Sequence, residues 1–374
     1  MSTAPAKVQI PYVDLARQHR PIKTELLAAV EKVIDHSQYV LGEDVRTFER
    51  EFAVLCGTRF AVGVNSGTDA MILALKVLGI GPGDEVITAP NSFISSASCI
   101  ALLGARPVFV DVREDFNVDP EQLERAISPC TKAILPVHLN GRPAAMAPIM
   151  DVAVAHRLWV IEDCAEAVLA KYRGQHVGSF GTFGCFSLHP LKTLNACGDG
   201  GMITTNDPEL YERLKILRNL GLRDRDECVV WSGNSRLDDL QAALLLVKLN
   251  YLLAWTTSRR EIAAFYRREL AEVPGVEVPD ERPEEWAVYH RFVIQADRRD
   301  ALKHYLADHG VETAIHYPIP IHLQPAADAL GYKAGSFPVA ERQAERILSL
   351  PIYHDLEPEE REHVVRTLQE FYRR

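Results

Sequence analysis

Lys192 is a lysine in a part of the sequence where a surface side chain is not expected. It lies between two segments with the composition of buried strands, 182–188 and 202–205, and a glycine-rich turn follows it at residues 198–201. Burial disfavours a charged ammonium and lowers its pKa, and a lysine with a free amine can form a Schiff base with an aldehyde. The alternative is a lysine at a strand end whose ammonium reaches solvent along its apolar stem.

Two further polar groups follow apolar segments. Asp163 ends the run at 158–163, and a buried carboxylate needs a cationic or hydrogen-bonding partner. The stretch 65–70, Asn-Ser-Gly-Thr-Asp-Ala, follows a strand pattern and opens a helix, so its N–H groups and the Thr68 hydroxyl can bind a phosphate at the positive helix terminus. Taken singly, Asp163 could equally cap the next helix or pair with an arginine, and Ser-Gly-Thr could be only a helix cap.

The three groups together predict a site for pyridoxal 5′-phosphate. In such a site a lysine holds the aldehyde, an aspartate stabilises the protonated pyridine nitrogen, and a turn binds the phosphate. Their order along the chain, with the phosphate turn first and the lysine last, fits this interpretation.

Short apolar runs alternate with helical patterns through the first two thirds of the chain. This alternation predicts an α/β fold with a large, mainly parallel sheet covered on both faces, in which ligands bind beyond the carboxyl ends of the strands. The predicted strands are 60–64, 85–89, 107–111, 132–137, 158–163, 182–188 and 202–205.

The remaining segments predict flanking helices and a second domain. Helices are expected at 21–36 and 43–55, and a long helix over 236–270 leaves the large domain. After it, strand patterns at 289–294 and 311–316 alternate with helical ones, which is typical of a small α+β domain. The other predicted helices of this domain are 298–309, 338–348 and 357–372. We therefore expect a large domain over residues 1–250 and a small one over 251–374.

Composition excludes several functional classes. The chain has 374 residues and a net charge of −10 without a basic run, which argues against nucleic-acid binding. No apolar run approaches the length of a membrane span, and the N-terminus lacks the apolar core of a signal peptide, so we expect a cytoplasmic protein that does not bind membranes. The seven cysteines form no CxxC pair, and we expect no disulfide and no metal site.

The motifs around these residues resemble a known family, the DegT/DnrJ/StrS group of pyridoxal phosphate-dependent nucleotide-sugar aminotransferases. The most specific stretches are Ser-Leu-His-Pro-Leu-Lys at 187–192 and Gly-Asn-Ser-Arg-Leu-Asp at 233–238, joined by Glu-Asp-Cys-Ala at 162–165. The resemblance covers essentially the whole chain. It implies a fold type I aminotransferase with a large sheet domain, a small C-terminal domain, and a homodimer with both active sites at the subunit interface.

The resemblance also implies a role for each matching residue. Lys192 would hold the cofactor and carry the proton, and Asp163 would face the pyridine nitrogen. The other implied residues are Gly67, Thr68 and Ser187 with Asn234 of the second subunit at the phosphate, Phe93 stacked on the ring, Glu166 near the ring hydroxyl, and Tyr39, His316, Tyr317 and His322 at the substrate. The alternative for Phe93 is a plain core residue.

The chain departs from the family pattern at three positions near the cofactor, one of which is Phe93, which lies one residue closer to Pro90 than in many members. Many members have Gln or His where this chain has Glu166, and many have Tyr where it has Asn140. The implied reaction moves an amino group from L-glutamate to a nucleotide-linked ketosugar. Asp199, in the turn after the lysine, favours a 3-keto-6-deoxyhexose linked to dTDP. The alternatives are a 4-keto sugar or a ketocyclitol as acceptor, a dehydratase of the same fold, whose members carry His in place of the lysine, and a cofactor-binding regulator without turnover.

Overall fold

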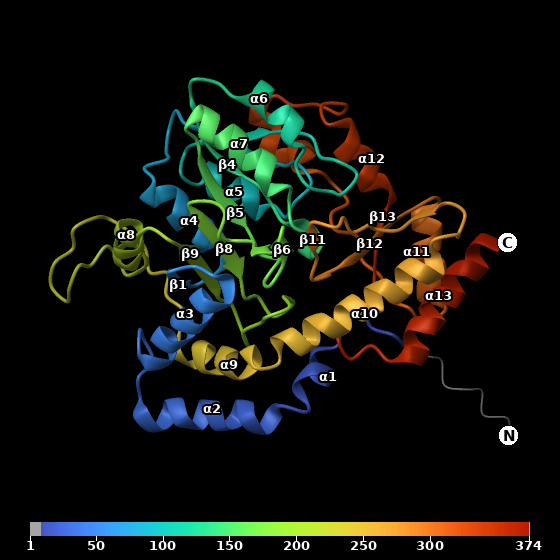
Figure 1. The fold of residues 1–374 in the computed structure, drawn as a ribbon, viewed down its shortest axis with the longest axis horizontal. Coiled ribbons are helices and arrows are strands. Elements are labelled where there is room, and N and C mark those ends of the chain that lie inside the picture. The colour runs from blue at the N-terminus through green and yellow to red at the C-terminus, as the bar shows by residue number, and fades with distance from the viewer. Residues whose placement is uncertain (1–8, 374) are drawn as a thin grey trace.

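The computed structural model of the protein describes residues 9–373 and contains a large mixed sheet between two layers of helices (Figure 1). The strand order is β1-β9-β8-β5-β4-β2-β3, and only β9 runs antiparallel to its neighbours. This confirms the predicted α/β fold with a mainly parallel sheet. The strands are β1 (Phe60–Val64), β2 (Glu85–Thr88), β3 (Arg106–Phe109), β4 (Thr131–Leu135), β5 (Trp159–Asp163), β8 (Phe183–Ser187) and β9 (Gly201–Thr205).

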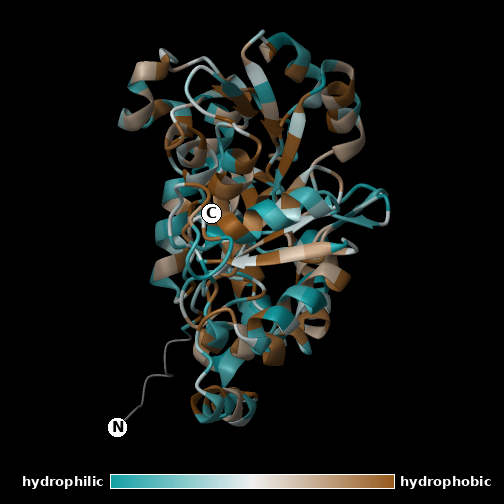
Figure 2. Ribbon diagram, turned by 90° about the vertical axis from the view of Figure 1, so that its left-hand side faces the viewer, coloured by the Kyte–Doolittle hydropathy of each residue, from teal (hydrophilic) through white to brown (hydrophobic). Residues whose placement is uncertain are grey.

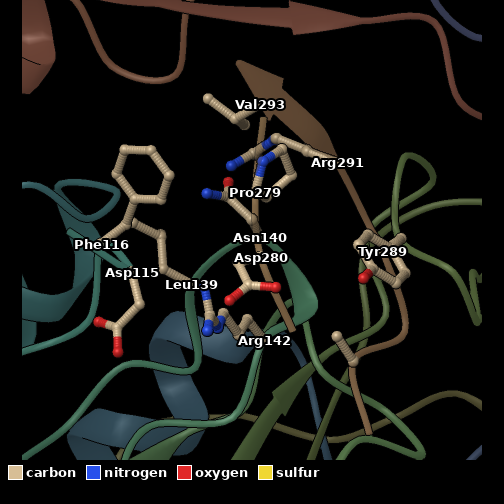
Figure 3. Close-up of a pocket in the computed structure, with 11 residues that line it drawn as sticks. Asp115, Phe116, Leu139, Asn140, Arg142, Pro279, Asp280, Tyr289, Arg291 and Val293 are labelled. Atoms are coloured by element: carbon tan, nitrogen blue, oxygen red, sulfur yellow. The ribbon is translucent and has the colours of Figure 1, made fainter. Parts of the chain in front are cut away.

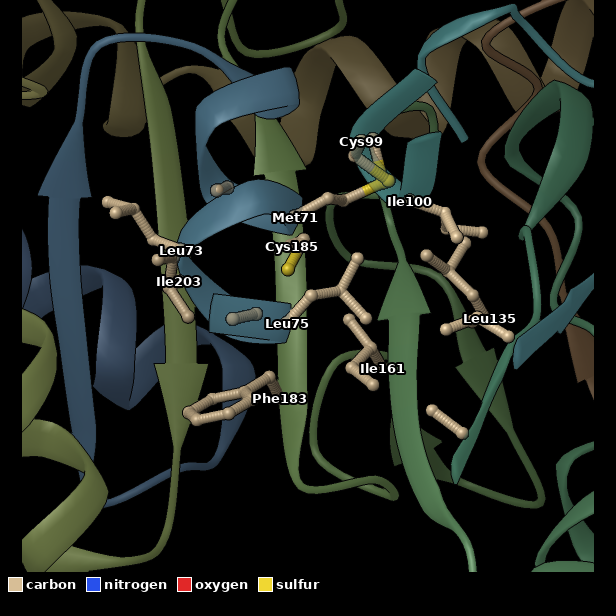
Figure 4. Close-up of a cluster of buried hydrophobic side chains, with 14 of the residues drawn as sticks. Met71, Leu73, Leu75, Cys99, Ile100, Leu135, Ile161, Phe183, Cys185 and Ile203 are labelled. Carbon is tan, nitrogen blue, oxygen red and sulfur yellow. The ribbon is translucent and has the colours of Figure 1, made fainter. Parts of the chain in front are cut away.

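Successive strand residues point to opposite faces of the sheet, and helices cover both faces. Ile161 belongs to a core cluster with residues of α4 (Gly67–Val77), α5 (Ser95–Ala101) and α8 (Pro208–Arg218), whereas its neighbour Val160 belongs to another cluster with residues of α7 (Met146–His156) on the other face. Figure 4 shows the first of these two layers, with Ile161, Phe183 and Ile203 of the strands against Leu75 of α4. The strands are therefore mostly apolar, with charged residues such as Glu85, Arg106 and Asp163 at strand ends, and brown segments run through the sheet in Figure 2.

Among the helices that accompany this sheet, α2 (Lys23–His36) and α3 (Glu43–Cys56) confirm the helices predicted at 21–36 and 43–55. Ser66 caps α4 because its side chain accepts a hydrogen bond from the N–H of Asp69 at 3.0 Å. The helices are α1 (Leu15–His19), α2 (Lys23–His36), α3 (Glu43–Cys56), α4 (Gly67–Val77), α5 (Ser95–Ala101), α6 (Leu123–Ala126), α7 (Met146–His156), α8 (Pro208–Arg218) and α9 (Asp239–Leu249), with short 3-10 turns η1 (Pro120–Gln122) and η2 (Leu139–Gly141).

The C-terminal part has its own antiparallel sheet, β10-β12-β13, and its own apolar core. A small third sheet, β11-β6-β7, joins it to the first part because β11 pairs with β6. The elements are α10 (Leu252–Leu270), β10 (Val276–Glu277), β11 (Glu285–Trp286), β12 (Phe292–Ala296), α11 (Arg299–Asp308), η3 (Ile321–Leu323), η4 (Pro325–Leu330), α12 (Pro338–Arg346), β13 (Ile347–Leu350) and α13 (Pro358–Arg373), with β6 (Lys171–Tyr172) and β7 (Gln175–His176).

Three predicted elements of this part differ from the structure. The expected helix over 236–270 is two helices, α9 and α10, bent by 59° at residues 250–251. The expected strand over 311–316 contributes only single bridges at Val311 and Ala314, and the expected helix over 338–348 ends at Arg346. The division at residue 250 stays a prediction, although the bend falls at this position.

Within residues 9–373, no single helix is both long and apolar enough to cross a membrane. The bent pair α9 and α10 meets the length and composition criteria for a membrane span only when the two helices are counted together.

Candidate active site

A cavity of about 380 Å³ opens beyond the carboxyl ends of β5 and β8. Its volume lies in the range usual for sites that bind small molecules. Most of the predicted site residues line it, namely Gly67, Thr68, Phe93, Asp163, Glu166, Ser187, Lys192, His316 and Tyr317. Most of the site residues predicted from the sequence therefore lie around one cavity at the edge of the sheet.

Lys192 lies in the turn after β8 and points into this cavity, with 15% of its side chain exposed. The turn is fixed by Asn195, whose side-chain amide donates to the Lys192 carbonyl at 3.0 Å. Asn195 is in turn held by the fully buried Lys248, whose Nζ donates to the Asn195 Oδ1 at 2.6 Å. Burial lowers the pKa of Lys192 below its ordinary value, although the nearby Glu166 carboxylate opposes this. A larger fraction of free amine is what a nucleophilic lysine requires.

Asp163 is the last residue of β5 and is buried at the cavity wall. Its carboxylate accepts hydrogen bonds from the Ser96 hydroxyl at 2.8 Å and from the N–H of Ala165 at 3.1 Å. No cationic nitrogen among residues 9–373 lies within 4.0 Å of it, and burial raises its pKa above the ordinary value. A buried carboxylate that faces a cavity without a cation is suited to a cationic ligand.

The start of α4 forms the predicted phosphate turn. The N–H groups of its first turn have no hydrogen-bond acceptor within the helix backbone and can therefore bind an anion. The Thr68 hydroxyl lies 2.8 Å from the Ser95 hydroxyl. Gly67 is required by close packing, because a Cβ there would lie 2.7 Å from the Cβ of Ser187. Ser66 and Ser95 also line the cavity at this end and are absent from the sequence-based prediction.

Glu166 lies at the opposite wall in an ionic cluster. Its carboxylate is 2.7 Å from the Arg291 guanidinium and 3.4 Å from the Lys192 Nζ, and it accepts from the N–H of Asn140 at 2.8 Å. Burial alone would raise the pKa of Glu166, but the charges of Arg291 and Lys192 outweigh it and hold this pKa well below its ordinary value. Arg291 was missed by the sequence-based prediction.

The aromatic residues lie at the cavity mouth. Phe93 is 54% exposed, and its ring centroid is 5.7 Å from that of Tyr317. The Nδ1 of His316 lies 2.9 Å from the Ser349 hydroxyl, and burial lowers the pKa of His316 to about 3. His316 is therefore neutral near pH 7. The half-exposed Phe93 is not a plain core residue.

Three predicted site residues do not line this cavity. Tyr39 and Asn234 are both exposed. His322 is buried elsewhere, where its Nε2 lies 3.0 Å from the Glu341 carboxylate and its ring packs edge-on to Phe337. These contacts hold the His322 side chain away from the cavity, so the structure does not support its predicted contact with the substrate. The role of Asn234 across a subunit interface stays a prediction.

One buried group among residues 9–373, His138, Glu162 and Cys164, has metal-like spacing. The N–H of Ala144 donates to the His138 Nδ1 at 2.9 Å, so the Nε2 carries the proton toward Glu162 at 3.1 Å. Both Glu162 oxygens also accept from backbone N–H groups, those of Gly178, Phe180 and Gly181, at 2.7–2.9 Å. This arrangement is a saturated hydrogen-bond network that fixes the end of β5.

The cavity as a whole fits the predicted cofactor. It offers a cradle for a phosphate at Gly67, a buried carboxylate without a cation at Asp163, and a buried amine at Lys192. These three groups match the phosphate, the pyridine nitrogen and the aldehyde of pyridoxal 5′-phosphate in chemical type.

Comparison with known proteins agrees with this site. The model of the DegT/DnrJ/EryC1/StrS aminotransferase family matches residues 20–369. The dTDP-3-amino-3,4,6-trideoxy-alpha-D-glucose transaminase of Streptomyces venezuelae is 42% identical over an alignment of 375 positions, which covers 100% of this chain and 99% of the relative.

Two solved structures have the same fold. The structure of S. venezuelae DesV has a TM-score of 0.96 at 43% identity and covers 98% of this chain and 99% of its own. Bacillus subtilis NtdA, solved with bound cofactor PMP, has a TM-score of 0.92 at 29% identity and covers 99% of this chain and 87% of its own. The predicted enzyme class is confirmed, and the chain belongs to the DegT/DnrJ/EryC1/StrS aminotransferase family.

Proposed function

We propose that this aminotransferase moves the amino group of L-glutamate to the keto carbon at position 3 of a dTDP-linked 6-deoxyhexose. The observation that carries the proposal is the position of Asp199, which lines the cavity together with Lys192. Several family members that aminate position 3 have Asp at this point of the turn, whereas many that aminate position 4 have Glu. The name of the S. venezuelae relative, which describes a 3-amino sugar on dTDP, supports the same choice.

The cofactor of this family is pyridoxal 5′-phosphate, and this chain uses it. When bound, it supplies an aldehyde and an electron-withdrawing ring, which make amino transfer possible. Lys192 would hold it and move protons at its Nζ, Asp163 would keep the ring nitrogen protonated, and Gly67, Thr68 and Ser187 would bind the phosphate. The neutral His316 and the exposed face of Phe93 lie on the side where substrate would enter.

A panel of acceptors tests the position that is aminated. The purified enzyme is given L-glutamate with a 3-keto or a 4-keto dTDP-6-deoxyhexose, or with a ketocyclitol, and the 2-oxoglutarate released is measured. We expect the 3-keto sugar to have the highest kcat/KM, with nitrogen on C3 of the product by NMR. Nitrogen on C4, or a preference for the carbocycle, would contradict the choice of substrate and leave the aminotransferase assignment intact.

We also propose a homodimer in which Asn234 completes the site of the partner. The chain after α8, which extends from the body of the molecule in Figure 1, carries exposed apolar residues up to the 88% exposed Trp231. Asn234 follows on the same segment. A projecting apolar segment of this kind is typical of a protein–protein interface.

Mixing two inactive variants tests the shared site. Lys192→Ala and Asn234→Ala protein, mixed equally and allowed to exchange subunits, should recover about a quarter of the wild-type activity, because half of the dimers are hybrids with one intact site. The control is Lys192→Ala mixed with the Lys192→Ala/Asn234→Ala double variant, which contains no intact site. No recovery in the first mixture, despite demonstrated exchange, would refute sharing.

A further inference from the structure

The Glu166 carboxylate is shared between two cations of the cavity. Its Oε1 lies 2.7 Å from the Nη1 of Arg291 and 3.4 Å from the Nζ of Lys192. All three side chains are largely buried, with 8% of Arg291 and 5% of Glu166 exposed. The arginine is the nearer partner, so it competes with the lysine for this carboxylate.

The backbone of Asn140 fixes the arginine and the glutamate relative to each other. Asn140 has a φ of 60°, a left-handed conformation that asparagine adopts more readily than most residues. In this turn its N–H donates to Glu166 at 2.8 Å, and its carbonyl accepts from the N–H of Arg291 at 3.3 Å. Figure 3 shows the Arg291 and Asn140 side chains together in the wall of a small neighbouring cavity.

A second contact holds the guanidinium from the other side. The Nη2 of Arg291 donates to the Tyr317 hydroxyl at 3.1 Å, and its Cζ lies 5.3 Å from the centre of that ring. The Arg291 side chain, just before β12, therefore has a fixed position between Glu166 in the loop after β5 and Tyr317 at the cavity mouth.

Few other charges act on this cluster. Burial lowers the pKa of His290 well below its ordinary value and that of His316 to about 3, so both are neutral near pH 7. Burial raises the pKa of Tyr12 and of Tyr317, which keeps them neutral as well. The charged groups that act on Lys192 are then Glu166, Arg291 and, on β5, Asp163.

We propose that Arg291 is a positioning residue for transamination, because its pairing with Glu166 prevents that carboxylate from holding a proton tightly on Lys192. Without the arginine, Glu166 would face Lys192 alone, and the buried ion pair would favour the charged, unreactive ammonium. With it, the positive charge of Arg291 offsets part of the effect of the Glu166 carboxylate on Lys192. The proposal rests on the assignment of Lys192 as the reacting amine.

The proton affinity of Lys192 can be measured without turnover. Cofactor-free, full-length protein is labelled with a trace of acetic anhydride over a pH series, and acetylation of the Lys192 peptide is read by mass spectrometry, with the exposed Lys132 as an internal reference. Labelling rises as the amine loses its proton. We expect Arg291→Met to move the midpoint up by about one pH unit, because removing a like charge from the surroundings of the Lys192 ammonium favours its charged form.

Replacing the other partner should have the opposite effect. Glu166→Gln leaves the arginine unpaired beside Lys192 and should move the midpoint down, and the double variant Glu166→Gln/Arg291→Met should return it toward the wild-type value. In the loaded enzyme, the acid limb of the kcat–pH profile should shift in the same direction as the labelling midpoint of each variant.

An unchanged midpoint in folded Arg291→Met would overturn the proposal. If Arg291→Met does not fold, Glu166→Gln provides the test. A labelling midpoint of Lys192 that does not fall in Glu166→Gln would also overturn the proposal. Both results are independent of the proposed function, because labelling needs neither a sugar nor turnover. Failure of every ketosugar in the acceptor panel would instead refute the proposed function while leaving the charge competition at Lys192 intact.

Discussion

Replacement of Lys192 by alanine is expected to lower transamination by about four orders of magnitude, the upper range for loss of a group that transfers protons, while the protein stays folded. The side chain lies at the cavity with little exposure and is the only lysine that lines it among residues 9–373. Release of 2-oxoglutarate from L-glutamate in the presence of the best ketosugar measures the loss, and circular dichroism measures the fold.

Lys192→Arg is the matched control for charge. Arginine keeps the positive charge beside Glu166 but offers no free amine at neutral pH, so it should be as inactive as alanine. Substantial activity in the arginine variant would mean that the charge of Lys192, and not its amine chemistry, is what the reaction needs. Full turnover in Lys192→Ala would refute the assignment of the active site.

Asp163→Asn is expected to lower the rate by about three orders of magnitude, within the range for removing one acid–base group. Asparagine has nearly the same shape and can still accept from the N–H of Ala165, but an uncharged amide cannot keep a pyridine nitrogen protonated. The loss is measured from initial rates with saturating L-glutamate, and the melting temperature should stay near the wild-type value.

The adjacent carboxylate provides the control for burial. Glu162→Gln changes the preceding residue of the same strand, whose carboxylate oxygens accept hydrogen bonds from the N–H groups of Gly178, Phe180 and Gly181. It should cost about 1–3 kcal/mol of stability by leaving buried donors unpaired. Glu162 does not line the cavity, so its variant should lose stability rather than rate. An Asp163→Asn enzyme that is unstable but catalytically normal would show that Asp163 is structural.

The sequence predicts the fold and the cofactor end of the site because both depend on local signals. Asp163 and Ser187 stand at the ends of apolar runs, and the ends of parallel strands meet at one edge of a sheet whatever the strand order is. Gly67 and Thr68 follow a serine at the start of a helix, which is a local capping pattern.

The parts that were missed depend on contacts between distant segments. Nothing local marks Arg291, because its role comes from a glutamate 125 positions earlier in the chain. The bend between α9 and α10 was missed because the apolar spacing continues through Tyr251, and neither glycine nor proline interrupts it. His322 does not line the cavity because its side chain contacts Glu341 of a separate helix, α12, and no local signal in the sequence marks this contact.

The antiparallel strand β9 has a consequence for how the chain can fold during synthesis. Among residues 9–373, β1 pairs only with β9, so the partner of Phe60 is Thr205, about 145 residues later in the chain. The helices α2 and α3 pack on α9, which is later still. Contacts this distant in sequence form slowly because a long loop must close first. Residues 9–64 are therefore synthesised before many of their native neighbours, and the apolar face of α2 that packs on α9 remains uncovered until α9 has been made.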